Sequence, residues 1–115
     1  MIMTSTQPKT LKFREELAKL ILSGQKNVTW RLFDDKHICE GDIVALLVWR
    51  TLEPFATAKI VSVYEKRMGD LQDQDFEGHE TFSSAQEMFE TYSRYYQQPI
   101  GPQTTAKIIR FELQS

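Results

Sequence analysis

A second cysteine is absent from this sequence. Cys39 is the single cysteine among 115 residues, so no internal disulfide can form and the fold does not depend on an oxidising compartment. No apolar run approaches the roughly 20 residues that a membrane helix requires. Residues 1–9 are polar and lack the charged-then-apolar pattern of a signal peptide. We therefore expect a cytoplasmic protein with no membrane partner and no disulfide-linked partner.

An excess of positive charge is also lacking. The chain has 14 Lys and Arg residues against 16 Asp and Glu residues, which gives a formal net charge of −2. Proteins that contact many phosphates of a duplex are usually basic, because each contact releases counterions. The overall charge therefore argues against strong duplex binding. It leaves room for a local basic pocket that binds one nucleotide, a single-stranded segment or a small anion.

What is present is the composition of one ordinary globular domain. Hydrophobic residues make up 41% of the chain and charged residues 26%, with no internal repeat and no low-complexity tract. The length suits a single domain, because typical domains have about 100–150 residues. We predict a flexible N-terminal tail over residues 1–8 and one domain over residues 9–115.

Hydrophobic periodicity predicts five strands and two helices. The strands are expected at 11–13, 28–32, 43–49, 55–64 and 104–113, and the helices at 14–23 and from the serine caps Ser83 and Ser84 to Pro99. The nearly continuous apolar strand 43–49 is expected to be buried on both faces, and 69–81 to be irregular. Parallel βαβ crossovers would need helices between most strands, and these are missing. The predicted fold class is α+β, a small, mostly antiparallel β-barrel with two covering helices.

The residues with the clearest chemical potential lie around the second predicted strand. In 28–32 the apolar residues alternate with Thr29 and Arg31, so these two share one face if the apolar set faces the core. A sheltered Lys26 beside an arginine would have its charged form disfavoured and could take the proton of a threonine hydroxyl. Arg31 could stabilise an oxyanion or bind a phosphate. In the alternative interpretation the two cations are solvated and Thr29 only favours a strand.

Several motifs, in this order along the chain, resemble the ASCH superfamily. The family pattern has a helix that ends in Gly-x-Lys, then Thr-x-Arg on a strand, then an apolar position followed by x-x-Gly-Asp. A central strand, an acid just before a serine-capped helix and a closing strand complete it. The matching segments are 20–31, 38–42, 55–63, 80–84 and 106–113. The resemblance covers about residues 9–113, nearly the whole chain.

This resemblance implies a PUA-like β-barrel with a cleft between barrel and helices. Family members are generally proposed to bind RNA or to handle nucleosides, with no cofactor. A small bacterial branch hydrolyses the acetyl amide of N(4)-acetylcytidine with a lysine, a threonine and an acid. Carried over by motif, Thr29 would be the nucleophile, Lys26 its base and Glu80 the orienting acid, while Arg31 would suit a phosphate or an oxyanion. Glu77 is the alternative acid; we prefer Glu80 because its distance to the serine cap needs no gap.

Other polar residues have a structural and a functional interpretation. His79 could be a general acid or a loop residue that makes an ordinary hydrogen bond. His37, Cys39 and His79 could together ligate a metal, but no local pair has the spacing of a structural zinc site, so we predict no metal. Cys39 is expected to be a small buried hydrophobe in a strand rather than a nucleophile.

Aromatic residues are predicted to serve mainly in the core. Trp30 and Trp49 are both expected there, although Trp49 with Arg50 at a strand end could instead form a stacking edge for a base. The tyrosines of the second helix are expected to form its packing face, with Tyr96 as a candidate for a hydroxyl that reaches the cleft.

Three functional hypotheses follow. The leading one is a module that binds RNA or a modified nucleoside in a cleft lined by Lys26, Thr29, Arg31 and Glu80. Further ligand-binding candidates are Glu77, His79 and Tyr96. The second hypothesis is a metal-independent amidohydrolase that acts on N(4)-acylated cytidine. The third is a protein-interaction domain without catalysis.

Overall fold

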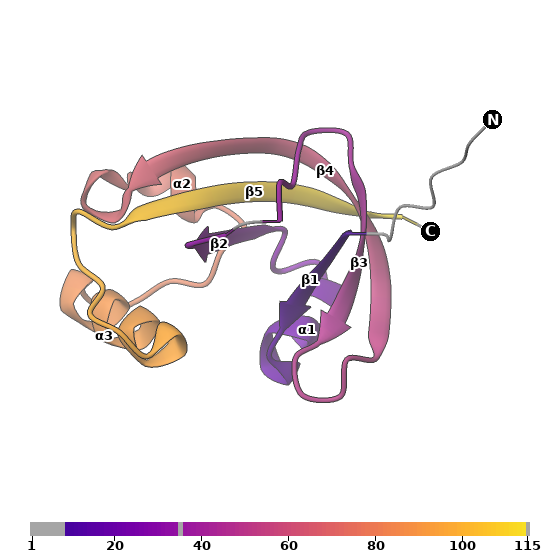
Figure 1. Ribbon diagram of the computed structural model, residues 1–115, viewed down its shortest axis with the longest axis horizontal. Coiled ribbons are helices and arrows are strands. Elements are labelled where there is room, and N and C mark those ends of the chain that lie inside the picture. The colour runs from indigo at the N-terminus through magenta and orange to yellow at the C-terminus, as the bar shows by residue number, and fades with distance from the viewer. Residues whose placement is uncertain (1–8, 35, 115) are drawn as a thin grey trace.

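A five-stranded sheet in the order β1-β3-β4-β5-β2 forms the centre of the molecule (Figure 1). The structure is a computed structural model and describes residues 9–34 and 36–114; the predicted tail over residues 1–8 lies outside them. The strands are β1 (Lys9–Phe13), β2 (Val28–Leu32), β3 (Ile43–Val48), β4 (Pro54–Arg67) and β5 (Thr105–Gln114). The helices are α1 (Glu15–Leu22), α2 (Asp73–Phe76) and α3 (Ala85–Tyr96), with a 3-10 turn η1 (Met68–Asp70).

The sheet is mostly antiparallel and curls into a half-barrel. Only β1 and β3 pair in parallel among the four strand pairs of the described residues. The register between β4 and β5 shifts between Ile60 and Ser62, and such a bulge bends its strand. The predicted α+β class with mostly antiparallel pairing is therefore confirmed.

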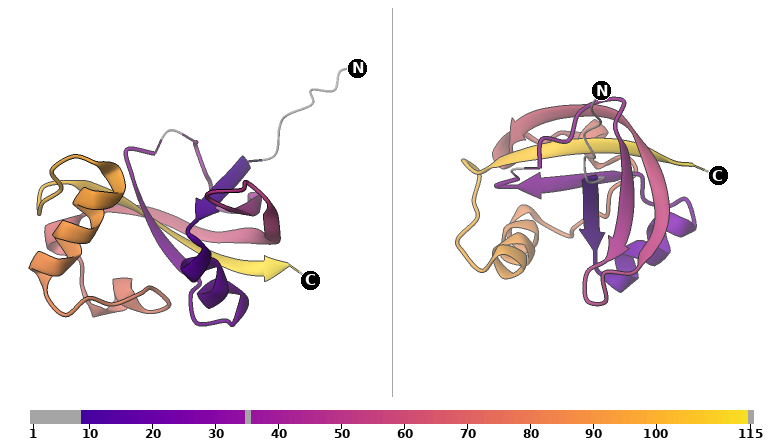
Figure 2. Two further views of the ribbon diagram at one scale, coloured as in Figure 1. Left: turned by 90° about the horizontal axis from the view of Figure 1, so that it is seen from below. Right: turned by 45° about the vertical axis from the view of Figure 1, so that its right-hand side comes forward.

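Two hydrophobic clusters lie at opposite ends of the long strands β4 and β5. One joins α1 and the edge strand β1 to β3, with Ile21, Leu46 and Phe111 among its buried members. The other joins α3 to β2, with Trp30 and Met88 at its centre. Figures 1 and 2 show the same division: β4 and β5 run the length of the molecule, α1 lies at one end and α3 at the other. The two halves of the molecule, one around each cluster, thus share one sheet.

Local signals explain where the helices begin and end. Gly24 follows α1 with φ of 85°, a left-handed conformation that glycine adopts without steric cost. Ser84 caps α3, because its hydroxyl accepts the backbone N–H of Glu87. None of the helices in the described residues is long and apolar enough to cross a bilayer.

The structure corrects four expectations. The segment 69–81 is not wholly irregular, because η1 and α2 lie in it; the carboxylate of Asp75 anchors α2 by accepting hydrogen bonds from Tyr64, Lys66 and Gln72. Strand β3 is not buried on both faces, since its first residue, Ile43, is exposed and only alternate residues are fully buried.

The other two corrections concern single side chains. Trp49 does not lie in the core: it follows the last residue of β3, in the turn to β4, and 53% of it is exposed. Cys39 is exposed and lies in the loop between β2 and β3 rather than in a strand. In both cases an apolar neighbourhood in the sequence predicted burial, but the residue lies in a turn or loop and is exposed.

Candidate functional site

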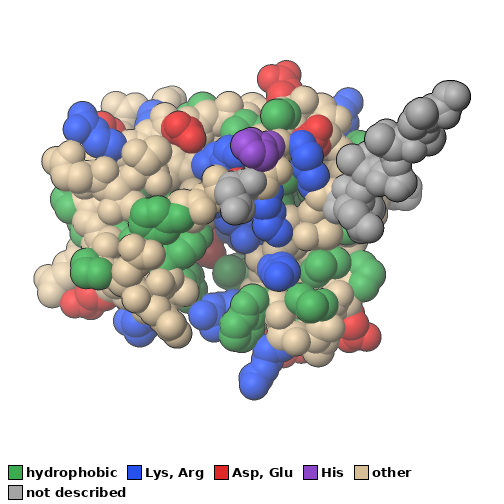
Figure 3. All heavy atoms as spheres, in the orientation of Figure 1, with side chains coloured by type: hydrophobic (Ala, Val, Ile, Leu, Met, Phe, Trp, Pro, Cys, Tyr) green, Lys and Arg blue, Asp and Glu red, His purple; other side chains and the backbone are tan. Residues whose placement is uncertain are grey.

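A cavity of about 310 Å³ opens between the two halves of the molecule. Its wall includes the basic side chains of Lys12, Arg14, Lys26, Arg31 and Lys36, against one carboxylate, that of Glu80, among the residues that the structure describes. It also includes the aromatic rings of Phe13, Trp30, Trp49, Tyr92, Tyr95 and Tyr96. Figure 3 shows Lys and Arg side chains gathered around the recess near the middle of this face. A chain with a net charge of −2 thus concentrates positive charge at one concave site.

Lys26 and Glu80 form an ion pair at the bottom of this cavity. The Lys26 Nζ donates to Glu80 Oε1 at 2.6 Å and to the Val28 carbonyl at 2.6 Å. Only 2% of the Lys26 side chain is exposed, against 22% for Glu80. The ammonium is therefore enclosed, and its partner carboxylate keeps an edge that a ligand can reach.

Gly78 brings Glu80 to Lys26 across more than 50 residues of sequence. Its carbonyl accepts the backbone N–H groups of Asn27 and Val28 at 2.9 and 3.1 Å, which ties the loop to the start of β2. Gly78 has φ of 82°, and a Cβ atom there would collide with the Asn27 side chain. This close approach therefore requires glycine, and it places the next residues of the loop beside Lys26.

His79 contacts Glu80 through its ring nitrogen Nδ1. Its ring stacks on the Trp30 indole, with centroids 3.7 Å apart and planes 11° from parallel. His79 Nδ1 lies 2.7 Å from the Glu80 carbonyl oxygen and 3.0 Å from Glu80 Oε1, and Nε2 lies 3.2 Å from the Tyr92 hydroxyl. Burial, then the positive charge of Lys26, lower the pKa of His79 to about 4. The ring is therefore neutral at neutral pH, with the proton on Nδ1, because both oxygens near Nδ1 can only accept.

The surroundings of the ion pair shift both of its pKa values downward. For Lys26, burial lowers the pKa below its ordinary value, and Glu80 only partly offsets this. For Glu80, burial acts to raise the pKa, but His79, Lys26 and the hydrogen bond from Lys26 outweigh it and leave the pKa low. The carboxylate is therefore charged at neutral pH, while the lysine gives up its proton more readily than usual.

Thr29 and Arg31 reach the same cavity from β2. Thr29 is buried, and its hydroxyl accepts a hydrogen bond from Arg31 Nε at 3.3 Å. Arg31 also donates to the Lys12 carbonyl at 2.7 Å, and its guanidinium lies 4.7 Å from the centre of the Phe13 ring. Burial lowers the pKa of Arg31, but a guanidinium keeps its proton in proteins. The Thr29 hydroxyl therefore faces a fixed positive charge.

Most of the residues predicted for the site meet at this cavity. The predicted residues that line the cavity are Lys26, Thr29, Arg31, His79, Glu80 and Tyr96. The Tyr96 hydroxyl accepts the Leu32 N–H at 3.0 Å. Glu77 is exposed and not part of the cavity wall, and its carbonyl accepts a hydrogen bond from Arg110 instead.

Sequence reasoning missed the cations at the mouth of the cavity, Lys12, Arg14 and Lys36. Lys12 alternates with the buried residues Leu11 and Phe13, which is a weak signal that it points away from the core. Nothing in the local sequence distinguishes Arg14 or Lys36 from ordinary surface residues. Among residues 9–34 and 36–114, no group of three or more His, Cys, Asp or Glu side chains is placed to hold a metal ion.

Comparison with known proteins defines the fold. No protein-family model matches the sequence, and no curated protein matches it. A DUF984 family protein from Enterococcus faecalis V583 superposes with a TM-score of 0.77 at 16% identity, covering 96% of this chain and 82% of that one. An ASCH domain from Lactobacillus crispatus JV V101 gives 0.70 at 13% identity, covering 91% and 79%. ASCH from Zymomonas mobilis gives 0.65 at 15% identity, covering 90% and 65%.

Proposed function

Because this chain has the ASCH-domain fold, we propose that it binds one nucleotide unit of RNA, or a modified nucleoside, in the cavity between its half-barrel and its helices. The observation that carries the proposal is the lining of this cavity. Among the described residues, five basic side chains, the Glu80 carboxylate and several aromatic rings converge on it, in a chain that is acidic overall. Such a mixture suits a planar polar group that is joined to a negative charge.

Each part of the lining has a counterpart in a nucleotide. Aromatic rings give a base a surface to stack on, and this contact tolerates any base. The exposed edge of the Glu80 carboxylate can accept an exocyclic amine, whereas Lys26 can donate to a ring nitrogen or a carbonyl. Arg31 offers a planar fork of donors, which matches a phosphate. The volume lies at the lower end of the roughly 300–1,000 Å³ of small-molecule sites.

Replacing Arg31 with alanine is expected to weaken binding by about 10- to 150-fold, since a hydrogen bond to a charged group contributes about 1.5–3 kcal/mol. The measurement is a titration at low salt with nucleosides, nucleotides and short single-stranded RNAs. Arg67→Ala is the matched control, because Arg67 is exposed and pairs with Asp70 away from the cavity. Circular dichroism checks that both variants fold. Absence of binding by the unmodified protein, or equal binding by Arg31→Ala, rules the proposal out.

A second function, hydrolysis of an acylated cytosine, is favoured by one observation. Lys26, Thr29 and Glu80 line the same cavity, as this chemistry requires. Lys26 would act in its neutral form, which burial favours. It would take the proton of the Thr29 hydroxyl as that oxygen attacks the acyl carbonyl, pass the proton to the departing cytosine amine, and water would then cleave the acyl ester. In the structure the Thr29 hydroxyl contacts Arg31, so a bound ligand would have to redirect it towards Lys26.

If this hydrolysis occurs, the purified protein releases cytidine from N(4)-acetylcytidine and the Thr29→Val variant does not. Valine matches threonine in shape but has no hydroxyl, so the change removes the nucleophile with little effect on β2. Thr29→Ser is the control that keeps the hydroxyl. Product release is followed by chromatography. Full turnover by Thr29→Val contradicts this mechanism without affecting the binding proposal.

A further inference from the structure

Trp49 is a large aromatic side chain that the fold holds at the surface. Its backbone N–H donates to the Phe13 carbonyl at 2.8 Å, which ties the turn after β3 to the end of β1. Two further backbone hydrogen bonds close the turn, from Leu52 to Val48 and from Val48 to Glu53. Trp49 is 53% exposed on this fixed backbone, and tryptophan is enriched at interfaces because it combines a large apolar face with an N–H donor.

Arg14 stacks between this indole and a ring from the opposite half of the molecule. Its Cζ atom lies 5.3 Å from the centre of the Trp49 ring and 4.6 Å from that of Tyr95 on α3. Among the ion pairs of residues 9–34 and 36–114, none includes Arg14. The guanidinium is therefore oriented by aromatic faces rather than by a salt bridge.

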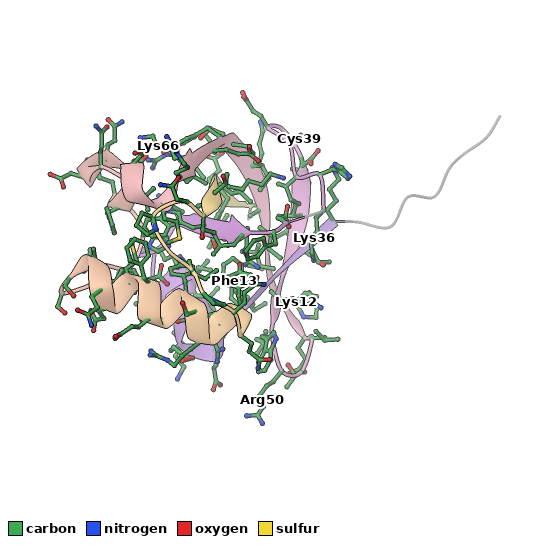
Figure 4. All side chains as sticks on the ribbon, turned by 60° about the vertical axis from the view of Figure 1, so that its left-hand side comes forward. Lys12, Phe13, Lys36, Cys39, Arg50 and Lys66 are labelled. Atoms are coloured by element: carbon green, nitrogen blue, oxygen red, sulfur yellow. The ribbon has the colours of Figure 1, made fainter. Side chains whose placement is uncertain are left out.

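A second cavity adjoins the first at these two side chains. It measures about 330 Å³ and lies between the N-terminal end of α1 and the turn after β3. Arg14 and Trp49 line both cavities, whereas Arg50 and the two acidic residues Glu15 and Glu16 line only the second. Figure 4 shows Lys36, Lys12 and Arg50 following one another along this side of the molecule. Basic side chains therefore continue past the central cavity to Arg50, beside the two acids of the first turn of α1.

We propose that this second cavity is a base-binding subsite, so that the ligand is a nucleic acid strand of at least two nucleotides. One base occupies the central cavity, the neighbouring base stacks on Trp49, and the phosphate between them lies against Arg14. The inference rests on the proposed function, because it assumes that the central cavity takes a base. The observation that supports the inference is the pair of side chains that the two cavities share, Arg14 and Trp49. A phosphate, which is an anion, joins two adjacent nucleotides and suits the cation, and a base can stack on the aromatic ring.

The test compares three ligands that differ by one part at a time. The first is a nucleoside 3′-monophosphate. The second adds an abasic sugar at that phosphate, and the third is the full dinucleotide, in which this second sugar carries adenine. Each ligand is prepared with all four bases in the first position. We expect the full dinucleotide to bind about 5- to 150-fold tighter than the abasic one, which is the range for stacking of one base. Trp49→Ala removes this difference, and Trp49→Phe keeps most of it.

A second set of variants separates the phosphate contact from the stacking. Arg14→Gln is expected to weaken both dinucleotides equally while leaving the gain from the second base in place. Leu52→Ala is the matched control, because Leu52 is exposed on the same turn and lines neither cavity. Its affinities should equal those of the unmodified protein.

The outcomes distinguish the two proposals. If the monophosphate binds and the full and abasic dinucleotides bind equally, the second subsite is wrong and the proposed function stands. The same holds if Trp49→Ala weakens the monophosphate as much as the dinucleotide, because Trp49 then serves the central cavity alone. If no ligand of any of the three kinds binds at low salt, the proposed function itself fails.

Discussion

Replacing Glu80 with alanine is expected to lower the free energy of unfolding by about 3 kcal/mol at neutral pH. The change leaves the Lys26 ammonium, which is 2% exposed, with a backbone carbonyl as its remaining partner. A buried charge that loses its counter-ion cannot recover its hydration without opening the structure. Urea unfolding followed by circular dichroism measures the effect.

The same variant should show a characteristic pH dependence. Without Glu80, the pKa of Lys26 falls further below its ordinary value, because burial already lowers it. The unfolded chain then binds more protons than the folded one up to the ordinary lysine pKa, so the stability of the variant rises with pH. We therefore expect the cost of Glu80→Ala to shrink as the pH is raised from 7 to 9.

Two controls identify the source of this loss. Asp70→Ala breaks the exposed pair with Arg67 and should cost at most about 1 kcal/mol, since such pairs contribute little. The double variant Lys26→Met with Glu80→Gln removes both charges and should recover most of the stability, because no buried ion is left unpaired. A cost of Glu80→Ala no larger than that of Asp70→Ala would show that the buried pair does not stabilise the fold.

His79 is expected to make the protein lose stability as the pH falls from about 6.5 to about 4. The pKa of His79 in the folded protein is about 4, below the ordinary value of 6.5. Between these pH values the unfolded chain therefore binds a proton that the folded protein does not bind. Stability therefore rises with pH across the window and is fully present above 6.5. The whole change is on the order of 3 kcal/mol, because each unit of pKa difference corresponds to about 1.4 kcal/mol.

The matched comparison uses the two histidines of the chain. His79→Gln should flatten the pH dependence between 4.5 and 6.5, whereas His37→Asn should leave it unchanged because the His37 side chain is exposed. Asparagine suits that position, since His37 has φ of 55°. Urea unfolding at four pH values in this window gives the slopes. Equal slopes for both variants would place the acid sensitivity elsewhere, for instance in the low-pKa carboxylates of Asp75 and Glu80.

The sequence by itself determined the five strands, the two longer helices and one face of the site. The alternation in 28–32 predicts that Val28, Trp30 and Leu32 are buried, and β2 has these bounds and this burial. It also predicts that Thr29 and Arg31 share a face, and both line the cavity. These inferences succeed because side-chain direction along a strand depends only on neighbouring residues.

Only the tertiary structure decided which acid joins the site and which aromatic residue leaves the core. Spacing to the serine cap favours Glu80 but leaves Glu77 as an alternative. The choice is made by Gly78, whose carbonyl binds the start of β2 and places Glu80 at the cavity. Likewise, Trp49 ends an apolar run that suggests burial, yet it lies at the surface because its turn is held against β1. Contacts of this kind join segments far apart in the chain, and no local preference encodes how two distant loops meet.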